Sequence, residues 1–241
     1  MSIVEVPAAV RCRLWRIDLD ATLSAEAIAS LSDDEWERAH RFVFAHDRRR
    51  FIAAHAALRS TLSAETGIPA AGLDFRFGAF GKPALVEPPG IQFNMSHSKS
   101  VGMIAVAIPT GSDSEIGVDV ELLRHMPDAE ALAETYFTAH ERAALAAAAP
   151  HERDLAFLRC WTRKESCLKA TGLGLSVDTR SFEVGVDGGA REVRIAGEAG
   201  LTRLELASFD GGKDLVCAAA RVQAIDTPRA RPLMPEREAC L

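Results

Sequence analysis

Apolar side chains recur with the 3.6-residue period of an α-helix in two long stretches of the chain. In residues 47–65 they form one stripe that ends at Gly67, a residue suited to the left-handed turn that closes many helices. In residues 152–171 a second stripe ends at Gly172. The pattern therefore predicts two long amphipathic helices, each closed by a glycine.

Another helix is predicted to begin at Ser32. The order Ser-Asp-Asp-Glu places Glu35 three residues after Ser32, which is the spacing of a capping box at a helix N-terminus. Residues 132–148 also favour a helix, although their run of alanines says little about packing.

Short apolar runs separated by Gly, Pro and polar turns predict β-strands in the rest of the chain. Four short runs fall between residues 73 and 109, and a polar turn follows at 110–115. The other predicted strands cover residues 11–18, 116–122, 181–186, 191–195, 201–209 and 215–222.

A weak internal repeat connects the two halves of the chain. The helical residues 51–59 can be aligned with 161–169, and the strand at 101–108 has a counterpart at 215–222. The repeat predicts two related α+β halves. Chance similarity between two amphipathic helices is the alternative explanation.

Composition limits the classes of function. The 241 residues are 48% hydrophobic with a formal charge of −6, which suits one large domain or two small ones. No apolar run approaches the ~20 residues of a membrane span, and the N-terminus has no secretory signal, so we expect a cytoplasmic protein that does not enter membranes. The negative charge disfavours general nucleic-acid binding. Five cysteines without a C-x-x-C pair favour reduced thiols over disulfides or zinc.

Two acidic residues lie on one face of the predicted strand at 116–122. Side chains of a strand alternate between faces, so Asp119 and Glu121 point to the same side. The simpler interpretation is a half-exposed strand with solvated acids. The functional interpretation is a Mg²⁺ site, since magnesium is held by a few carboxylates together with substrate phosphates.

The second long helix offers a third carboxylate. Trp161, Glu165 and Lys169 are spaced four residues apart and form one row along the helix. A salt bridge between Glu165 and Lys169 is the simpler interpretation. Neighbouring cations instead predict a basic surface beside the carboxylate, as a phosphate-binding site requires. These cations are Arg159, Arg163 and Lys164.

Residues 93–98, with the sequence FNMSHS, are predicted to carry a histidine that can bind phosphate. Ser96 and His97 are adjacent, so their side chains diverge in an extended chain and form a poor pair of nucleophile and base. A turn with an incidental histidine is the alternative.

Residues 81–83, with the sequence GKP, are similar to the end of a P-loop but fail its pattern. Arg76 stands where the first glycine belongs, and Pro83 replaces the metal-binding hydroxyl residue. Lys82 can still reach an anionic ligand from this stiff turn.

A basic cluster stands out in an acidic chain. Such a run is either a solvated surface or a site for several phosphates. Its members are Arg38, His40, Arg41, His46, Arg48, Arg49 and Arg50.

Taken in order, these motifs resemble the 4′-phosphopantetheinyl transferases of the Sfp type over about residues 32–182. Four elements carry the resemblance, and one alone would be weak evidence. They are GKP at 81–83, FNMSHS at 93–98, IGVDVE at 116–121 and WTRKESCLKATGLGLS at 161–176.

The resemblance implies a fold and an organisation. The expected fold is α+β, with two similar halves related by pseudo-twofold symmetry and the active site at their interface. Residues 1–112 would form a coenzyme A-binding half, and residues 113–224 a half with the metal site and the catalytic helix. Residues 225–241, which are rich in Pro and Arg, would form a loose tail.

The resemblance also implies roles for residues. Asp119, Glu121 and Glu165 match the metal-binding carboxylates, with Mg²⁺ as the expected ion and Mn²⁺ able to replace it. Glu165, Lys169 and His97 are the expected catalytic residues, and the base could be Glu165, Lys169 or a metal-bound water. The expected coenzyme A contacts are Arg38, Arg50, Lys82, Ser96, His97 and Lys169. Glu35 lies where some family members have lysine, so no phosphate contact is assigned to it.

The implied reaction moves the phosphopantetheine arm of coenzyme A to a serine of an acyl, aryl or peptidyl carrier protein and releases adenosine 3′,5′-bisphosphate. A monomer is expected, because a paired-half fold needs no partner to complete its site. Arg153, Arg159 and Arg163 are expected to form a basic rim that steers acidic carriers. Two alternatives remain: a Mg²⁺-dependent phosphohydrolase that uses the same carboxylates, and a non-catalytic module that binds coenzyme A or a nucleotide.

Overall fold

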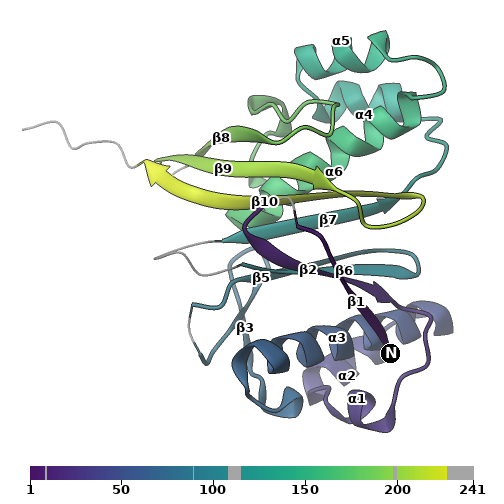
Figure 1. Cartoon of the computed structure of the whole chain (residues 1–241), viewed down its shortest axis with the longest axis vertical. Helices are drawn as coiled ribbons and strands as arrows, with labels where there is room; N and C mark the ends of the chain where they lie inside the picture. The colour runs from purple at the N-terminus through teal and green to yellow at the C-terminus, as the bar shows by residue number, and fades with distance from the viewer. Residues whose placement is uncertain (9, 89, 108–114, 198–199, 227–241) are drawn as a thin grey trace, which may run out of the picture.

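Two four-stranded antiparallel sheets form the middle of the molecule, with a long helix on the outer face of each (Figure 1). The structure is a computed structural model that describes residues 1–8, 10–88, 90–107, 115–197 and 200–226. The mixture of helices and sheets confirms the predicted α+β class.

The N-terminal half has the strand order β1-β2-β6-β5. The predicted strand at 11–18 is confirmed as β2 and the predicted helix at 47–65 as α3, which ends at Gly67 with φ +74°. The Ser32 capping box is confirmed at the start of α2. The elements of this half are β1 (Ser2–Val6), β2 (Cys12–Asp18), α1 (Ala25–Ala29), α2 (Asp33–His40), α3 (Ala45–Thr66), η1 (Ala70–Gly72), β3 (Phe75–Phe77), β4 (Pro83–Leu85), β5 (Phe93–Ser98) and β6 (Val101–Ala107).

The C-terminal half has the strand order β7-β10-β9-β8. The second long helix is confirmed as α6, closed by Gly172 with φ +67°. The elements of this half are β7 (Ile116–Leu122), α4 (Ala129–Tyr136), α5 (Ala139–Ala147), α6 (Arg153–Thr171), η2 (Gly174–Ser176), η3 (Thr179–Ser181), β8 (Arg191–Gly197), β9 (Gly200–Phe209) and β10 (Leu215–Asp226).

The same order of elements recurs in the two halves. In each half a long helix follows the first central strand, and the central strands then lie in the same order: β2-β6-β5 in one sheet and β7-β10-β9 in the other. The segments aligned in the sequence fall on α3 and α6 and on β6 and β10. The weak repeat in the sequence therefore corresponds to a repeat of structure.

Two predicted elements are wrong. The helix expected over 132–148 is two helices, α4 and α5, because the chain is extended at Phe137 and Thr138. Thr138 caps α5 in a capping box with Glu141, a signal that the alanine run obscured. The strand expected at 181–186 is an irregular segment after η3. The strand β1 and the helix α1 were not predicted.

Three apolar clusters hold the layers together. One lies between α3 and its sheet, one between the two sheets, and one between α6 and its sheet. The four cysteines within the described residues are buried and unpaired, as expected. No helix in the described part of the chain has the length and apolar character to cross a membrane.

The boundary expected at 112–113 lies outside the described residues. At the other end, β10 runs to Asp226 and so takes in two residues that were expected in the tail. Residues 227–241 of that tail also lie outside the described part of the chain.

Candidate active site

The two halves meet where β5 lies along the open edge of β7. Asn94 and Ser98 occupy alternate positions of β5 and so share one face. Asn94 Oδ1 accepts the Val118 amide at 2.9 Å, and Ser98 Oγ accepts the Leu122 amide at 3.4 Å. Ser98 also donates to Glu121 Oε2 at 2.7 Å. Side chains of one half thus satisfy backbone groups on an edge strand of the other.

We call this contact between β5 and β7 the seam. A serine, a carboxylate and an ammonium meet in the middle of it. Ser96 Oγ donates to Asp119 Oδ1 at 2.8 Å, and Lys169 Nζ donates to the same oxygen at 2.6 Å. Lys169 Nζ also lies 3.0 Å from Ser96 Oγ. The three residues come from β5, β7 and α6, so the cluster needs both halves. Asp119 is buried, while Lys169 keeps 28% of its side chain exposed.

Close contact between β7 and α6 makes this cluster possible. Gly117 faces the helix, and a Cβ atom built on it would lie 2.1 Å from the Ser166 carbonyl oxygen and 2.4 Å from the Ala170 nitrogen. Only glycine lets the two backbones approach so closely. The approach brings Lys169 to Asp119.

Negative charge accumulates around Lys169. Burial raises the pKa of Asp119, although the Lys169 ammonium and the Ser96 hydroxyl oppose this effect. Burial also raises the pKa of Glu165; Lys169 opposes it, and repulsion from Asp119 and Glu121 adds to it. The three predicted carboxylates therefore interact electrostatically.

The carboxylates fit a hard cation by their chemistry, but they are not arranged as a finished metal site. Within the described residues, no three metal-binding side chains are grouped closely enough to hold an ion. Asp119 is paired with Lys169, and Glu121 accepts from Arg124 Nη1 at 2.8 Å. Oxygen ligands and mutual repulsion nevertheless favour a divalent cation such as Mg²⁺.

Two adjoining cavities open beside the cluster. The first, about 290 Å³, is bounded by the turn at 80–83 and by Glu165 and Lys169 of α6. The second, about 500 Å³, contains Arg38 and His55. The cavities share the lining residues Gly81, Pro83, Asn94 and Met95. Together they run from Glu165 and Lys169 to a region lined by both acids and cations, among them Glu37 and Arg38.

Arg38, an expected coenzyme A contact, lines the second cavity. Its guanidinium carbon lies 5.5 Å from the centre of the Phe51 ring, a cation–π contact. Arg41, another member of the basic cluster, lines the same cavity. All four of Arg38, Arg41, Arg48 and Arg49 are exposed, but only Arg38 and Arg41 line this cavity.

Arg50 and His97 line a separate cavity of about 370 Å³, together with Lys99 and Phe51. Arg50 makes two hydrogen bonds to the Asp20 carboxylate, each 2.8 Å. Desolvation and the nearby Lys169 ammonium lower the pKa of His97. Ser96 is buried and His97 is exposed, so the predicted divergence of these neighbours is confirmed.

Lys82 lines the 290 Å³ cavity, but its ammonium already has protein partners. Nζ contacts the Glu115 carboxylate and lies 3.1 Å from the carbonyl oxygens of Ile116 and Ala170. Burial lowers the pKa of Lys82, and Glu115 opposes this effect.

The sequence did not reveal a buried hydrogen-bond network beside the cavity that Arg38 lines. Glu35 accepts from Arg59 Nε at 2.7 Å and lies 2.8 Å from His55 Nδ1. Burial would raise the pKa of Glu35, but hydrogen bonds from His55, the Ser32 amide and Arg59 hold it at about 2. A signal for this network was present in the sequence. His55 and Arg59 are four residues apart on α3, and the internal repeat aligns them with Glu165 and Lys169.

The predicted basic surface on α6 is wrong for two of its members. Arg163 is buried and donates to the carbonyl oxygens of Val184 and Gly189. Lys164 is buried and lies 2.9 Å from Glu141. These cations hold α6 to the rest of its half, because each is satisfied by buried protein acceptors. The basic rim for carriers therefore loses Arg163.

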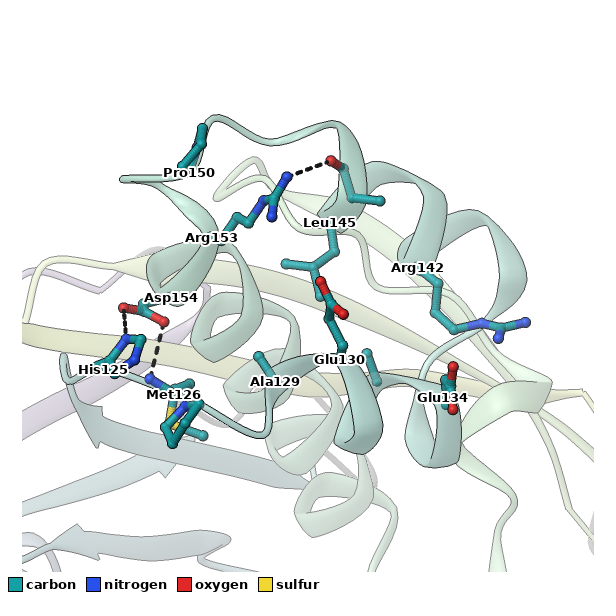
Figure 2. Close-up of a pocket in the computed structure, with 13 residues that line it drawn as sticks. His125, Met126, Ala129, Glu130, Glu134, Arg142, Leu145, Pro150, Arg153 and Asp154 are labelled. Carbon is teal, nitrogen blue, oxygen red and sulfur yellow. Dashed lines mark hydrogen bonds and ion pairs between the residues drawn. The ribbon is translucent and has the colours of Figure 1, made fainter.

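Another cavity, about 740 Å³, lies between α4, α5 and the start of α6. Figure 2 shows the hydrogen bonds of Asp154 with the His125 ring and the Met126 amide. It also shows that Arg153 donates to the Ala146 carbonyl oxygen of α5. None of the predicted catalytic, metal or coenzyme A residues lines this cavity. Arg153 thus lies at the far end of α6 from Lys169.

Comparison with known proteins shows the family of the chain. Residues 115–220 match the 4′-phosphopantetheinyl transferase superfamily, and residues 19–108 match the family described as 4′-phosphopantetheinyl transferase, N-terminal. The chain is similar to 4′-phosphopantetheinyl transferase HetI of Nostoc sp., with 39% identity over 68% of this chain and 69% of HetI. It is also similar to the putative 4′-phosphopantetheinyl transferase slr0495 of Synechocystis sp., with 33% identity over 68% of this chain and 66% of that protein. Sfp of Bacillus subtilis, another 4′-phosphopantetheinyl transferase, is 29% identical over 71% of this chain and 75% of Sfp. The chain therefore belongs to the 4′-phosphopantetheinyl transferase superfamily.

Proposed function

We propose that this enzyme transfers the 4′-phosphopantetheine arm of coenzyme A to a serine of an acyl or peptidyl carrier protein and releases adenosine 3′,5′-bisphosphate. One observation carries the proposal. Lys169 and Glu165 line one of two adjoining cavities, Ser96 and Asp119 hold the Lys169 ammonium beside it, and Arg38 lines the other cavity. An extended substrate with separated phosphates suits such a surface.

Lys169 is the residue that binds the transferred phosphate. Its ammonium is part-exposed at the cavity and is oriented by Asp119 and Ser96. A cation fixed in this way stabilises the charge on the phosphoryl oxygens without having to reorient. Arg38 and His97, which line two other cavities, suit the remaining phosphates of coenzyme A.

Glu165 is the residue that accepts the proton of the carrier serine. It lines the 290 Å³ cavity beside Lys169, and a carboxylate within reach of a hydroxyl can act as a general base. The serine oxygen then forms a bond to the β-phosphorus. The bond from that phosphorus to the bridging oxygen breaks, and the electron pair leaves with the nucleotide.

Asp119, Glu121 and Glu165 are the residues that would hold Mg²⁺, which Mn²⁺ can replace. All three supply carboxylate oxygens, the ligands that these ions prefer. The bound ion would supply charge neutralisation at the pyrophosphate.

We further propose that the enzyme works as a cytoplasmic monomer, without membrane or nucleic-acid partners. Support comes from the single chain, which contributes both sides of the seam, and from the net charge of −6.

The test is to incubate the purified protein with coenzyme A, Mg²⁺ and a panel of apo carrier proteins, and to record intact carrier mass. The expected result is a gain of one phosphopantetheine group and release of adenosine 3′,5′-bisphosphate. Chelator and Glu165→Gln should abolish the gain. Cleavage of coenzyme A without any carrier would indicate a phosphohydrolase instead. Binding of coenzyme A with no chemistry would indicate a binding module.

A further inference from the structure

We propose that Lys82 is a positioning residue: its ammonium ties the turn between β3 and β4 to the start of β7 and the end of α6, and so holds the Lys169–Asp119 pair in register. This inference rests on the proposed function, because it assigns Lys82 a part in the same site. It differs from the expectation that Lys82 binds coenzyme A.

The first argument is the hydrogen-bonding capacity of the side chain. A lysine ammonium has three protons and no acceptor. In this structure Nζ has three acceptors within reach, which are the Glu115 carboxylate and the carbonyl oxygens of Ile116 and Ala170, the latter two at 3.1 Å. Its side chain is only 16% exposed. No proton remains for a phosphate unless one of these bonds breaks.

The second argument is the place of each acceptor. Ala170 belongs to the last turn of α6, where carbonyl groups lack partners within the helix and favour a cation. It follows Lys169 directly. Ile116 opens β7, three residues before Asp119. Lys82 therefore holds the backbone next to both members of the Lys169–Asp119 pair.

The third argument is the shape of the turn that carries Lys82. The Gly81 amide donates to the Gly78 carbonyl at 2.9 Å, and the Gly78 amide donates to the Lys82 carbonyl at 2.9 Å. Gly81 has φ +79°, which glycine adopts without strain. This stiff turn lines the 290 Å³ cavity together with Glu165 and Lys169 of α6. Fixing the turn to α6 sets the width of the cavity.

Glu115 provides the means to separate the two roles of Lys82. It does not line the 290 Å³ cavity, and 39% of its side chain is exposed. Glu115→Gln removes the charged partner of Lys82 and leaves the ammonium in place. If Lys82 positions the seam, this change harms the reaction. If Lys82 binds coenzyme A, it frees the ammonium and leaves affinity unchanged or improved.

The experiment compares Lys82→Met, Glu115→Gln and the double variant, with Lys213→Met as a control at an exposed lysine. For each we would measure kcat with a carrier and the Kd of coenzyme A by calorimetry. We expect Lys82→Met to lower kcat about 10-fold to 100-fold, as misplacement of a site costs, with Kd changed by less than about threefold. Glu115→Gln should lower kcat in the same direction, and Lys82→Arg should restore part of it.

A Kd raised 10-fold or more by Lys82→Met, with wild-type kcat and Kd in Glu115→Gln, would overturn the proposal. Chemical unfolding gives a readout that does not depend on turnover. Because the two residues are paired, the double variant should lose less stability than the sum of the single variants. Losses of stability that simply add would also count against a positioning role for Lys82. Unfolding and coenzyme A binding need no carrier, so they remain informative even if the enzyme modifies none.

Discussion

Buried charged side chains in this protein are paired inside the fold. Lys164 meets Glu141, Glu35 meets Arg59, and Arg163 donates to backbone carbonyls. From the sequence, Arg163 and Lys164 resemble a basic surface, because a pattern of letters does not distinguish a solvated cation from one with a distant partner. The partner of Lys164, for example, lies 23 positions away along the chain.

Lys164→Met should therefore damage folding and leave phosphate binding untouched. Lys164 and Glu141 are 2% and 0% exposed, and removal of the lysine leaves the carboxylate buried and unpaired. Breaking such a pair typically costs about 3–5 kcal/mol. Chemical unfolding measures the loss, with Lys213→Met as the control. A change of less than about 1 kcal/mol would contradict a structural role.

The lowered pKa of Glu35 predicts how the free energy of unfolding depends on pH. Its pKa in the folded protein is about 2, below its ordinary value of 4.5. A group with a lowered folded pKa stabilises the fold above its ordinary pKa, and this contribution is lost as the pH falls toward the folded pKa. The contribution is about 3 kcal/mol, at 1.4 kcal/mol per pH unit.

Unfolding free energy measured between pH 6 and pH 3 should thus fall more steeply in the wild type than in Glu35→Gln. Glu37→Gln, on an exposed face of α2, is the matched control. Equal slopes for wild type and Glu35→Gln would show that the network does not stabilise the carboxylate.

Contact between β7 and α6 is the feature that matters most at the level of elements. Gly117→Ala would place a methyl group 2.1 Å from the Ser166 carbonyl, so the helix must move away from the strand. Overpacking of this kind costs about 3 kcal/mol. It should also separate Lys169 from Asp119 and lower the transfer rate.

Unfolding and turnover of Gly117→Ala measure both effects. Gly72→Ala is the control, since its new methyl group would lie 3.6 Å from Ile68, an ordinary contact. A Gly117→Ala enzyme with wild-type stability and rate would mean that the close approach is dispensable.

Much of the fold can be predicted from the sequence where local signals decide it. Periodicity and closing glycines predict α3 and α6, and alternation predicts β7. The break between α4 and α5 is hidden, because alanine-rich residues favour helix on both sides of Thr138. The site is predictable as a set of motifs. The bonds of Asn94, Ser96 and Ser98 to β7 are not, because they depend on how the two sheets meet.

At the level of the whole molecule, two related halves meet at one seam, where we place the reaction. The helix positions that carry Glu165 and Lys169 in the second half carry His55 and Arg59 in the first. There, Arg59 is buried and paired with Glu35, so the first half has a structural network at the positions where we propose that the second half carries out chemistry. Arg38 and His55 still line a cavity, which leaves the first half suited to holding the substrate.

We propose that the carboxylates and Lys169 at this seam carry out phosphoryl transfer. The most direct measurement is the single-turnover rate of carrier modification by Asp119→Asn, with coenzyme A affinity measured in parallel. Asparagine keeps the shape of the side chain and removes its charge. We predict a rate at least about 100-fold below the wild type, with affinity within about threefold. A rate within about threefold of the wild type would contradict a role for Asp119 in phosphoryl transfer.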